Sequence, residues 1–510
     1  MNKFSRTARS VTFAAIVGLS LGVSAPGMVA QAEGVRIVET ANIDFSRKGK
    51  ITIHKKDITD KDNSRAKNAT GDEVDDVVGT GLPGVVFTLQ KVKLDLKDPE
   101  NWSKIPKTVA EAKALGLEEP AITLDPTDEH GDTSKDHLDL GLYVVSEIKA
   151  PNGVVTGPDF LVTLPMTDSK GKAWDYDVVV YPKNTKAVAT KRVSDANKNQ
   201  NDVITYTINT PIPTIASGQK ISSYVITDDY DESKVSVEKD EDVVVKIEDK
   251  IISSDSYTLQ RNKDGAGRLE IEFKNSDELN ANSGKQVTTT IHAKVKKDVE
   301  GEVKNTAGVI FNNPSNENRL ITVPTNEVFT YYGNATIVKR DQDEQGKVLQ
   351  GAEFALYWSA DQTCDVTDIK PENQVKGAEG SSLPQDGKFV TDENGKLEIK
   401  GLHVTNLEDN DKTVSKQYCL VETKAPAGYV TPNLKDAITP FEIKVEQTDD
   451  GNGKIVSHKI IHASKEISNK KNPTPELPMT GGAGVGILAA IGAAIIGAGA
   501  WFARRNSAES

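Results

Sequence analysis

The chain has 510 residues, a formal net charge of −13 at pH 7 and only 5% aromatic residues. Once both ends are set aside as processing signals, this length suffices for about three domains of about 150 residues each. The acidic balance and the low aromatic content argue against nucleic acid or an anionic membrane as the natural partner.

The first 32 residues have the pattern of a secretory signal. Lys3, Arg6 and Arg9 precede an apolar run over residues 11–23, and small residues follow up to Ala32. This order predicts cleavage after Ala32. A retained membrane helix is disfavoured because the apolar run is too short to span a bilayer.

Two segments occur twice in the chain. Residues 82–89 and 349–356 share the pattern Leu-x-Gly-x-x-Phe-x-Leu, and residues 143–153 (YVVSEIKAPNG) match residues 418–428 (YCLVETKAPAG). The two pairs have the same order and a similar spacing, as internal repeats of one structural unit do. We therefore expect the first and last thirds of the chain to share a fold.

The fold class predicted from local patterns is all-β. Short runs rich in β-branched residues alternate with turn clusters such as residues 392–395 (DENG), and only residues 107–115 (KTVAEAKAL) have a helical pattern. Many short strands with few helices predict three tandem β-sandwiches. The runs taken as strands are residues 51–53, 176–181, 203–208, 287–295 and 455–461.

The same patterns give the expected domain boundaries. After the signal peptide (1–32) we expect an N-terminal sandwich, a middle sandwich and a C-terminal sandwich, then a proline-containing extended linker leading into a C-terminal signal. The expected ranges are 33–183, 184–330, 331–472, 473–481 for the linker and its motif, and 482–510 for an apolar span and basic tail.

The C-terminus combines a pentapeptide, an apolar stretch and basic residues in that order. The pentapeptide is Leu477, Pro478, Met479, Thr480 and Gly481. The apolar stretch over residues 482–502 is long enough to span a bilayer, and the arginine pair behind it would stay in the cytoplasm. The arrangement resembles the sorting signals read by sortases, which implies cleavage between Thr480 and Gly481 and an acyl-enzyme on Thr480. Residues 164–168 (LPMTD) have no apolar tail, so we interpret them as an ordinary strand and turn.

Residues 174–184 (WDYDVVVYPKN) end the first predicted domain. They resemble the pilin motif of Gram-positive shaft pilins, in which the lysine attacks the sortase acyl-enzyme, a role that falls here on Lys183. The residues suit that role because an alternating strand ends at Pro182 and leaves Lys183 at a domain junction. The alternative is a solvated linker lysine.

Residues 418–429 (YCLVETKAPAGY) resemble the E-box of the same family. The resemblance implies that Glu422 promotes an amide bond between a first-strand lysine and a last-strand asparagine, here Lys339 and Asn469. An apolar core lowers a lysine pKa and raises a carboxyl pKa, so a neutral amine could attack a carboxamide polarised by the acid. Strand register leaves open whether Lys339 points inward.

The middle domain offers a matching set in Lys191, Asp228 and Asn305. Here Asp228 would promote the bond between Lys191 and Asn305. The alternative is that all three face solvent on strands. In the first domain Lys55 and Asn184 bracket the sequence similarly, but its E-box is degenerate, so no crosslink is predicted there.

The only two cysteines, Cys364 and Cys419, lie in a chain with an export signal. An oxidising compartment favours one intrachain disulfide over two free buried thiols. His458 and His462 have a metal-like spacing but lie in a strand pattern without an accompanying glutamate, so we predict no metal site. We also expect no cofactor and no enzymatic activity on other molecules.

Taken together, these motifs resemble those of major shaft pilins of the actinobacterial type. The resemblance implies Cna-B-like, Ig-like domains. The resemblance implies a secreted, peptidoglycan-anchored fimbrial subunit that is polymerised by a pilin-specific sortase through bonds from Lys183 to Thr480 and supports adhesion. The implied partners are identical subunits, a housekeeping sortase with peptidoglycan, and tip and base pilins; host or bacterial surface receptors are further candidates. The alternatives are a monomeric wall-anchored adhesin, which has no use for Lys183, and a minor base pilin.

Overall fold

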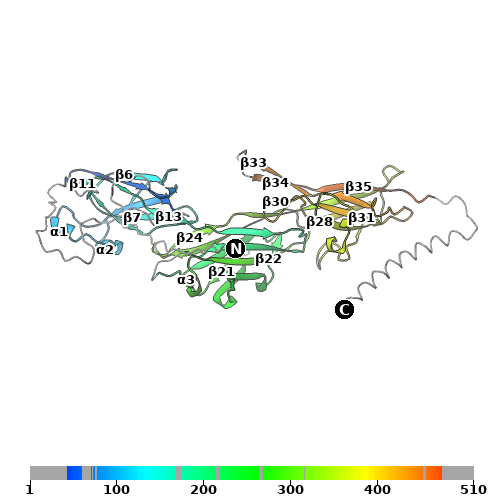
Figure 1. Cartoon of the computed structure of the whole chain (residues 1–510), viewed down its shortest axis with the longest axis horizontal. Coiled ribbons are helices and arrows are strands. Elements are labelled where there is room, and N and C mark those ends of the chain that lie inside the picture. The colour runs from blue at the N-terminus through cyan, green and yellow to red at the C-terminus, as the bar shows by residue number, and fades with distance from the viewer. Residues whose placement is uncertain are drawn as a thin grey trace, which may run out of the picture.

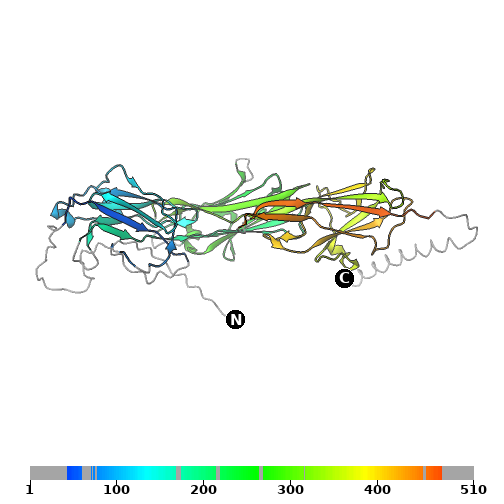
Figure 2. The same ribbon diagram turned by 90° about the horizontal axis from the view of Figure 1, so that it is seen from above.

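The chain folds into three β-domains arranged in a row, which gives the molecule an elongated shape (Figure 1; Figure 2). The predicted all-β class with tandem sandwiches is confirmed. The computed structural model describes residues 43–59, 71, 73–74, 77–167, 174–213, 219–263, 268–314, 316–451 and 455–473. Among these residues, no helix is long and apolar enough to cross a membrane. The predicted signal peptide, sorting motif and apolar span lie outside the described residues.

The first domain contains four short sheets around one core. Strand β1 alternates buried and half-buried residues, so that Ile51 and Ile53 are fully buried. It pairs in parallel with β12 and antiparallel with β6. The strands are β1 (Gly49–His54), β2 (Lys56–Asp57), β3 (Thr80–Gly81), β4 (Val86–Lys91), β5 (Ile122–Thr123), β6 (Asp132–Leu138), β7 (Gly141–Lys149), β8 (Val154–Val155), β9 (Phe160–Leu164), β10 (Met166–Thr167), β11 (Trp174–Asp175), β12 (Asp177–Val180) and β13 (Lys183–Lys186).

Helices are short. The predicted helix at residues 107–115 is confirmed as α2 (Val109–Ala114), which begins with a capping box between Thr108 and Glu111. Its Ala112 packs in a small cluster on the outer side of the first domain. The other α-helices among the described residues are α1 (Pro99–Trp102) and α3 (Asp277–Ala281).

The middle domain is a sandwich of two sheets with a large core. Strand β15 alternates regularly, burying Ile204, Tyr206 and Ile208. One sheet has the order β14-β15-β22-β18-β19, and the other contains β20-β21-β16-β23. The strands are β14 (Thr190–Ser194), β15 (Val203–Pro211), β16 (Tyr224–Tyr230), β17 (Val235–Ser236), β18 (Val243–Ile247), β19 (Lys250–Ile251), β20 (Tyr257–Lys263), β21 (Arg268–Phe273), β22 (Gln286–Val295), β23 (Gly301–Asn313) and β24 (Arg319–Pro324).

One long strand, β25 (Val328–Asp341), belongs to both the middle and the last domain. Its first part pairs with β23, and its second part pairs with β28 and, in parallel, with β35. The sheet therefore continues from one domain into the next. The last domain adds β26 (Glu353–Ser359), β27 (Phe389–Val390), β28 (Lys396–His403), β29 (Leu407–Glu408), β30 (Lys412–Thr413), β31 (Gln417–Lys424), β32 (Ile438–Phe441), β33 (Lys444–Asp449), β34 (Ile455–Ile461) and β35 (Ala463–Asn469).

The internal repeat in the sequence corresponds to a repeated strand pair. In the first domain β4 pairs with β7 and sets Phe87 opposite Glu147. In the last domain β26 pairs with β31 and sets Phe354 opposite Glu422. Both pairs contain a register shift just before the phenylalanine. The two repeats thus share one register as well as one fold.

The predicted disulfide between Cys364 and Cys419 is confirmed. Cys419 is fully buried on β31, and the bond ties the loop after β26 to that strand. It closes a loop of 55 residues inside the last domain.

The middle and last domains also meet through polar contacts. Buried Asp195 of the middle domain lies 3.1 Å from Nε2 of buried His403. His458, on the β33–β34 hairpin, contacts Glu302 of β23 through Nδ1 at 2.5 Å. The two histidine contacts come from different elements of the last domain, so the junction is held at more than one point.

Candidate functional site

Each of the three domains buries a lysine, a carboxyl group and an asparagine side by side. The burial requires explanation because charged groups are rarely buried without a partner. In each case the lysine is at most 1% exposed. The groups are Lys55, Glu147 and Asn184 in the first domain, Lys191, Asp228 and Asn305 in the middle domain, and Lys339, Glu422 and Asn469 in the last domain.

In the first domain the triad is fully connected. Lys55 Nζ donates to Glu147 Oε1, and Asn184 Nδ2 donates to Glu147 Oε2 at 2.8 Å. Asn184 Oδ1 accepts from the backbone N–H of Gly157 at 2.9 Å. One carboxyl group therefore bridges the amine and the carboxamide. This triad was left open from the sequence and is brought together by the fold.

In the last domain Lys339 points inward, which answers the question of its register. Lys339 Nζ donates to Glu422 Oε2 at 2.7 Å. Asn469, two positions beyond the partner of Lys339 on the parallel strand β35, is also buried, and its Nδ2 donates to the carbonyl of Val430 at 2.9 Å. The second oxygen of Glu422 and Oδ1 of Asn469 have no hydrogen-bond partner.

The middle domain has a different layout. Lys191 lies on β14 in one sheet, whereas Asp228 on β16 and Asn305 on β23 lie in the facing sheet. Lys191 Nζ donates to Asp228 Oδ2 across the sandwich. Both polar atoms of the Asn305 carboxamide lack a hydrogen-bond partner of ordinary geometry. All three residues are buried, so the alternative that they face solvent does not describe this structure.

In the middle and last domains burial shifts the pKa values of the lysine and of the acid in opposite directions. Desolvation lowers the pKa of Lys55, Lys191 and Lys339, although the neighbouring carboxylates oppose it. Desolvation also raises the pKa of Asp228 and Glu422, against the pull of their lysines. In these two domains the shifts favour transfer of a proton from the amine to the acid, and a neutral amine is a nucleophile.

An aromatic ring lies against each lysine. The distance from Nζ to the ring centroid is 5.7 Å for Lys55 and Phe87, and 5.6 Å for Lys339 and Phe354. In the middle domain the ring is Tyr206, at 4.8 Å from Lys191 Nζ. These rings exclude water from the amine, which is the source of its desolvation.

Lys183 has a separate environment. It is the first residue of β13, opposite Lys56 of β2, and its side chain is half-buried. The next residue, Asn184, is fully buried, because successive side chains of a strand point to opposite faces. Desolvation lowers the pKa of Lys183. Thr480 and the rest of the motif at residues 477–481 lie outside the described residues.

Other sequence candidates have structural roles. Leu164, Pro165 and Met166 of the second sorting-like segment are buried at the end of β9 and the start of β10. His458 contacts Glu302 and lies against aromatic rings. Among the described residues no cluster could hold a metal ion.

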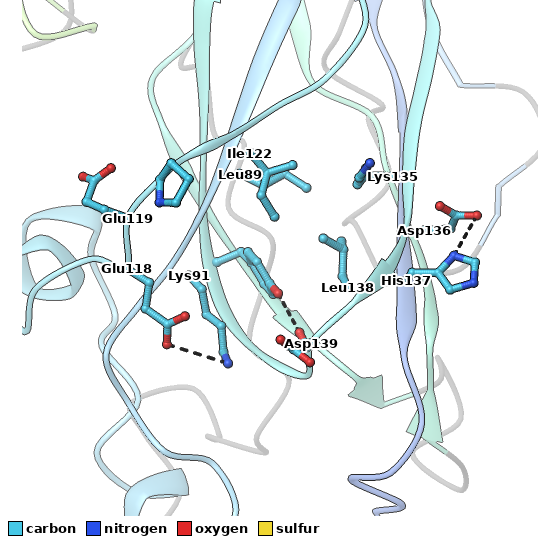
Figure 3. Close-up of a pocket in the computed structure, with 12 residues that line it drawn as sticks. Leu89, Lys91, Glu118, Glu119, Ile122, Lys135, Asp136, His137, Leu138 and Asp139 are labelled. Carbon is cyan, nitrogen blue, oxygen red and sulfur yellow. Dashed lines mark hydrogen bonds and ion pairs between the residues drawn. The ribbon is translucent and has the colours of Figure 1, made fainter.

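A cavity in the first domain lies apart from the triads (Figure 3). Leu89, Ile122 and Leu138 contribute apolar side chains to it, whereas charged groups such as Lys91 and Glu118 form a pair at 3.8 Å. None of the triad residues lines this cavity. We assign it no chemistry.

Comparison with known proteins identifies the family. Residues 46–185 match the N-terminal domain D1 of Gram-positive pilin subunits, residues 181–324 match the C2 terminal domain of cell surface antigen I/II, and residues 333–458 match a prealbumin-like fold domain. The full-length major pilin SpaD from Corynebacterium diphtheriae is 34% identical, with a TM-score of 0.66 over 85% of this chain and 100% of that chain. The chain belongs to the sortase-assembled major pilins of Gram-positive bacteria.

Two fimbrial subunits are similar in sequence to this pilin over nearly its whole length. Fimbrial subunit type 1 of Actinomyces viscosus is 28% identical over 98% of both chains. Fimbrial subunit type 2 of Actinomyces naeslundii is 28% identical over 94% of this chain and 92% of the relative. This pilin is therefore a structural subunit of the fimbrial shaft, displayed at the cell surface.

Proposed function

We propose that Lys183 is the amine that joins each subunit to the Thr480 carbonyl of a neighbouring subunit. Three features support this: its place in the motif at residues 174–184, its position at the end of the first domain, and the desolvation that lowers its pKa. A lowered pKa increases the fraction of neutral amine available to attack an acyl-enzyme. A pilin-specific sortase would supply that acyl-enzyme.

We also propose that each domain carries an intramolecular amide bond between lysine and asparagine. The observation that carries this is the threefold recurrence of a buried lysine, acid and asparagine that come from distant parts of each domain's sequence. Glu147 is assigned the same role in the first domain as Asp228 and Glu422 in the others. The proposed bonds are Lys55–Asn184, Lys191–Asn305 and Lys339–Asn469.

The reaction needs no added reagent. The lysine transfers a proton to the acid, its neutral nitrogen attacks Cγ of the asparagine, and the carboxamide nitrogen leaves as ammonia after taking up a proton. Each bond closes a loop of about 110 to 130 residues, which stabilises a domain by about 4–5 kcal/mol in the loop-closure treatment of crosslinks. A fibre subunit gains both mechanical and thermal resistance.

Attachment to the wall would follow from the sorting motif at residues 477–481. A housekeeping sortase would transfer Thr480 of the last subunit to peptidoglycan, with separate tip and base pilins completing the fibre. The mature protein would then be part of a wall-anchored fimbrium that supports adhesion to surface receptors.

The test of polymerisation compares two lysines of the same strand. Cell-wall extracts are boiled in detergent and reductant and blotted from cells carrying wild type, Lys183→Ala or Lys186→Ala. Lys186 is an exposed residue of β13 paired with Asp57, so its loss controls for a general disturbance of the strand. We expect a high-mass ladder that disappears only with Lys183→Ala. Monomer in all strains would favour a wall-anchored adhesin instead.

The test of the internal bonds is the intact mass of the purified mature protein. Each lysine–asparagine bond expels ammonia and lowers the mass by about 17 Da. Three bonds should therefore be visible as three such losses, and Glu147→Ala, Asp228→Ala and Glu422→Ala should each restore one of them. An unshifted mass in the wild type would refute the crosslinks.

A further inference from the structure

The middle triad differs from the other two in both its acid and its ring. Its acid is Asp228, one methylene shorter than the glutamates, and its ring is Tyr206 where the others have phenylalanine. The two differences occur together in one domain. The middle triad therefore has a shorter acid than the other two triads and a hydroxyl on its aromatic ring that the others lack.

The polar atoms of the middle triad are less completely paired than those of the first domain. Glu147 uses one oxygen for Lys55 and the other for Asn184. Asp228 uses Oδ2 for Lys191, while its Oδ1 has no hydrogen-bond partner. The Asn305 carboxamide is likewise without a partner at both of its polar atoms. A further hydrogen-bond donor would therefore stabilise the negative charge that develops on the carboxamide oxygen of the middle domain.

The ring of Tyr206 lies beside the lysine of the middle triad. Tyr206 is 1% exposed, and β15 places it opposite Val193, two residues along β14 from Lys191. Its ring lies 4.8 Å from Lys191 Nζ, and both Asp228 and Asn305 influence the pKa of its hydroxyl. No hydrogen bond of ordinary geometry occupies the hydroxyl. A buried polar group without a partner is costly, so its retention here calls for a function.

The protonation state of the hydroxyl suits a donor. Burial raises the pKa of Tyr206, and the negative charge of Asp228 raises it further, although the Asn305 amide has the opposite effect. The hydroxyl therefore keeps its proton throughout the pH range of growth. It can donate a hydrogen bond but does not act as a base.

We propose that Tyr206 is a further catalytic residue of the middle-domain crosslink, donating a hydrogen bond to Asn305 Oδ1 while Lys191 attacks. This rests on the proposed Lys191–Asn305 bond and adds a residue to its mechanism. Lys191 first gives one proton to Asp228, and its nitrogen then forms a bond to Cγ of Asn305 while the carbonyl electron pair moves to Oδ1. Tyr206 stabilises that oxygen.

Collapse of the intermediate restores the carbonyl and breaks the bond from Cγ to Nδ2. The leaving nitrogen takes up a proton and departs as ammonia, and the attacking nitrogen loses its second proton to become the amide N–H. Asp228 ends the reaction protonated, and Tyr206 is unchanged.

The test uses Tyr206→Phe in the full mature protein, which keeps the ring and removes only the hydroxyl. Proteolytic fragments are taken at intervals after a pulse of expression, and the fraction joining Lys191 to Asn305 is measured by mass spectrometry. We expect the bond to form about a hundredfold to a thousandfold more slowly than in wild type, the range seen when one donor to an oxyanion is removed. The bonds of the other two domains are measured in the same samples as internal references and should form at their wild-type rates.

Two controls separate catalysis from packing. Tyr224→Phe removes the hydroxyl of another buried tyrosine of the same core, which donates to Thr210 at 2.9 Å, and should leave the rate unchanged. In the Lys191→Ala background, which cannot form the bond, adding Tyr206→Phe should leave the melting temperature unchanged.

A Tyr206→Phe protein that crosslinks at the wild-type rate would overturn the proposal, as would a slower rate accompanied by a lower melting temperature in the Lys191→Ala background. A wild-type protein without the Lys191–Asn305 fragment would refute the proposed crosslink itself, which is a different outcome from failure of Tyr206 alone.

Discussion

Asn469→Ala removes the acceptor of the proposed crosslink in the last domain and should change how the subunit responds to force. With Lys339 and Asn469 joined, the chain between them, about 130 residues, carries no tension. Without the bond the domain can unfold and lengthen by about 3.5 Å per residue, or about 450 Å in total. The disulfide modifies this gain, because Cys364 and Cys419 keep 55 residues closed. The expected lengthening is therefore about 260 Å with the disulfide intact and about 450 Å after reduction.

The assay is single-molecule force spectroscopy on the mature protein held at its two ends. The wild type should show no step from the last domain, with or without reductant. Asn472→Ala is the matched control, since this exposed asparagine lies three residues beyond Asn469 and should behave like the wild type. A wild-type step of about 450 Å under reduction would refute the crosslink. A variant step that does not change with reductant would show that the disulfide between Cys364 and Cys419 had not formed in that protein.

Three further changes test other parts of the structure. Glu147→Gln removes the acid beside Lys55, so the bond between Lys55 and Asn184 should not form. The purified variant should then keep the ammonia that bond formation expels, a mass about 17 Da above that of a fully crosslinked protein with the same substitution. The first domain should also melt at a lower temperature by calorimetry. Asp195→Asn should weaken the junction of the middle and last domains by about 1–3 kcal/mol, seen as faster amide exchange around His403. Burial opposes ionisation of Asp195, but contacts that include His403 outweigh it and hold its pKa below the usual value. This stabilisation is therefore present above about pH 4 and is lost as the pH falls further, so the two proteins should converge in acid. Asp341→Asn removes a carboxylate that accepts from Tyr429 at 2.7 Å and whose pKa is lowered, and its thermal destabilisation at pH 7 should likewise disappear in acid.

The sequence was sufficient to predict the fold class, the repeat and the disulfide. The fold class follows from local patterns, the repeat from matching segments, and the disulfide from two cysteines in a chain with an export signal. Alternating burial gives β-strands directly, and two matching segments at similar spacing predict two equivalent domains. The same strand periodicity also predicts that Glu147 of the first domain takes the place that Glu422 has in the last domain. Glu147 lies four residues after Tyr143, as Glu422 lies four after Tyr418, and residues four apart share one face of a strand. The mismatch at Ile148 concealed this, although that side chain is exposed and takes no part in the triad.

Two kinds of contact could not be predicted from the sequence: the aromatic residue beside each buried lysine and the polar contacts between domains. Tyr206 is one of several buried aromatic residues, and its proximity to Lys191 follows from the pairing of β14 with β15 and the packing of one sheet on the other. The pairing of His458 with Glu302 depends on a hairpin of one domain reaching the next. Such contacts join residues that are far apart in the sequence and share no repeating pattern from which their contact could be predicted.

The placement of Lys183 next to Asn184 gives the first domain a role distinct from that of the other two. If force enters at Lys183 and leaves beyond Asn469, the covalent path runs through the bond from Lys191 to Asn305, along β25 to Lys339 and across to Asn469. The first domain, up to residue 182, lies outside this path, so resistance to tension does not explain a bond between Lys55 and Asn184. That bond would instead hold β13 against β1 and β2, and so keep Lys183 at a fixed place while a sortase approaches. A loss of this crosslink should then slow polymerisation more than it weakens the finished fibre.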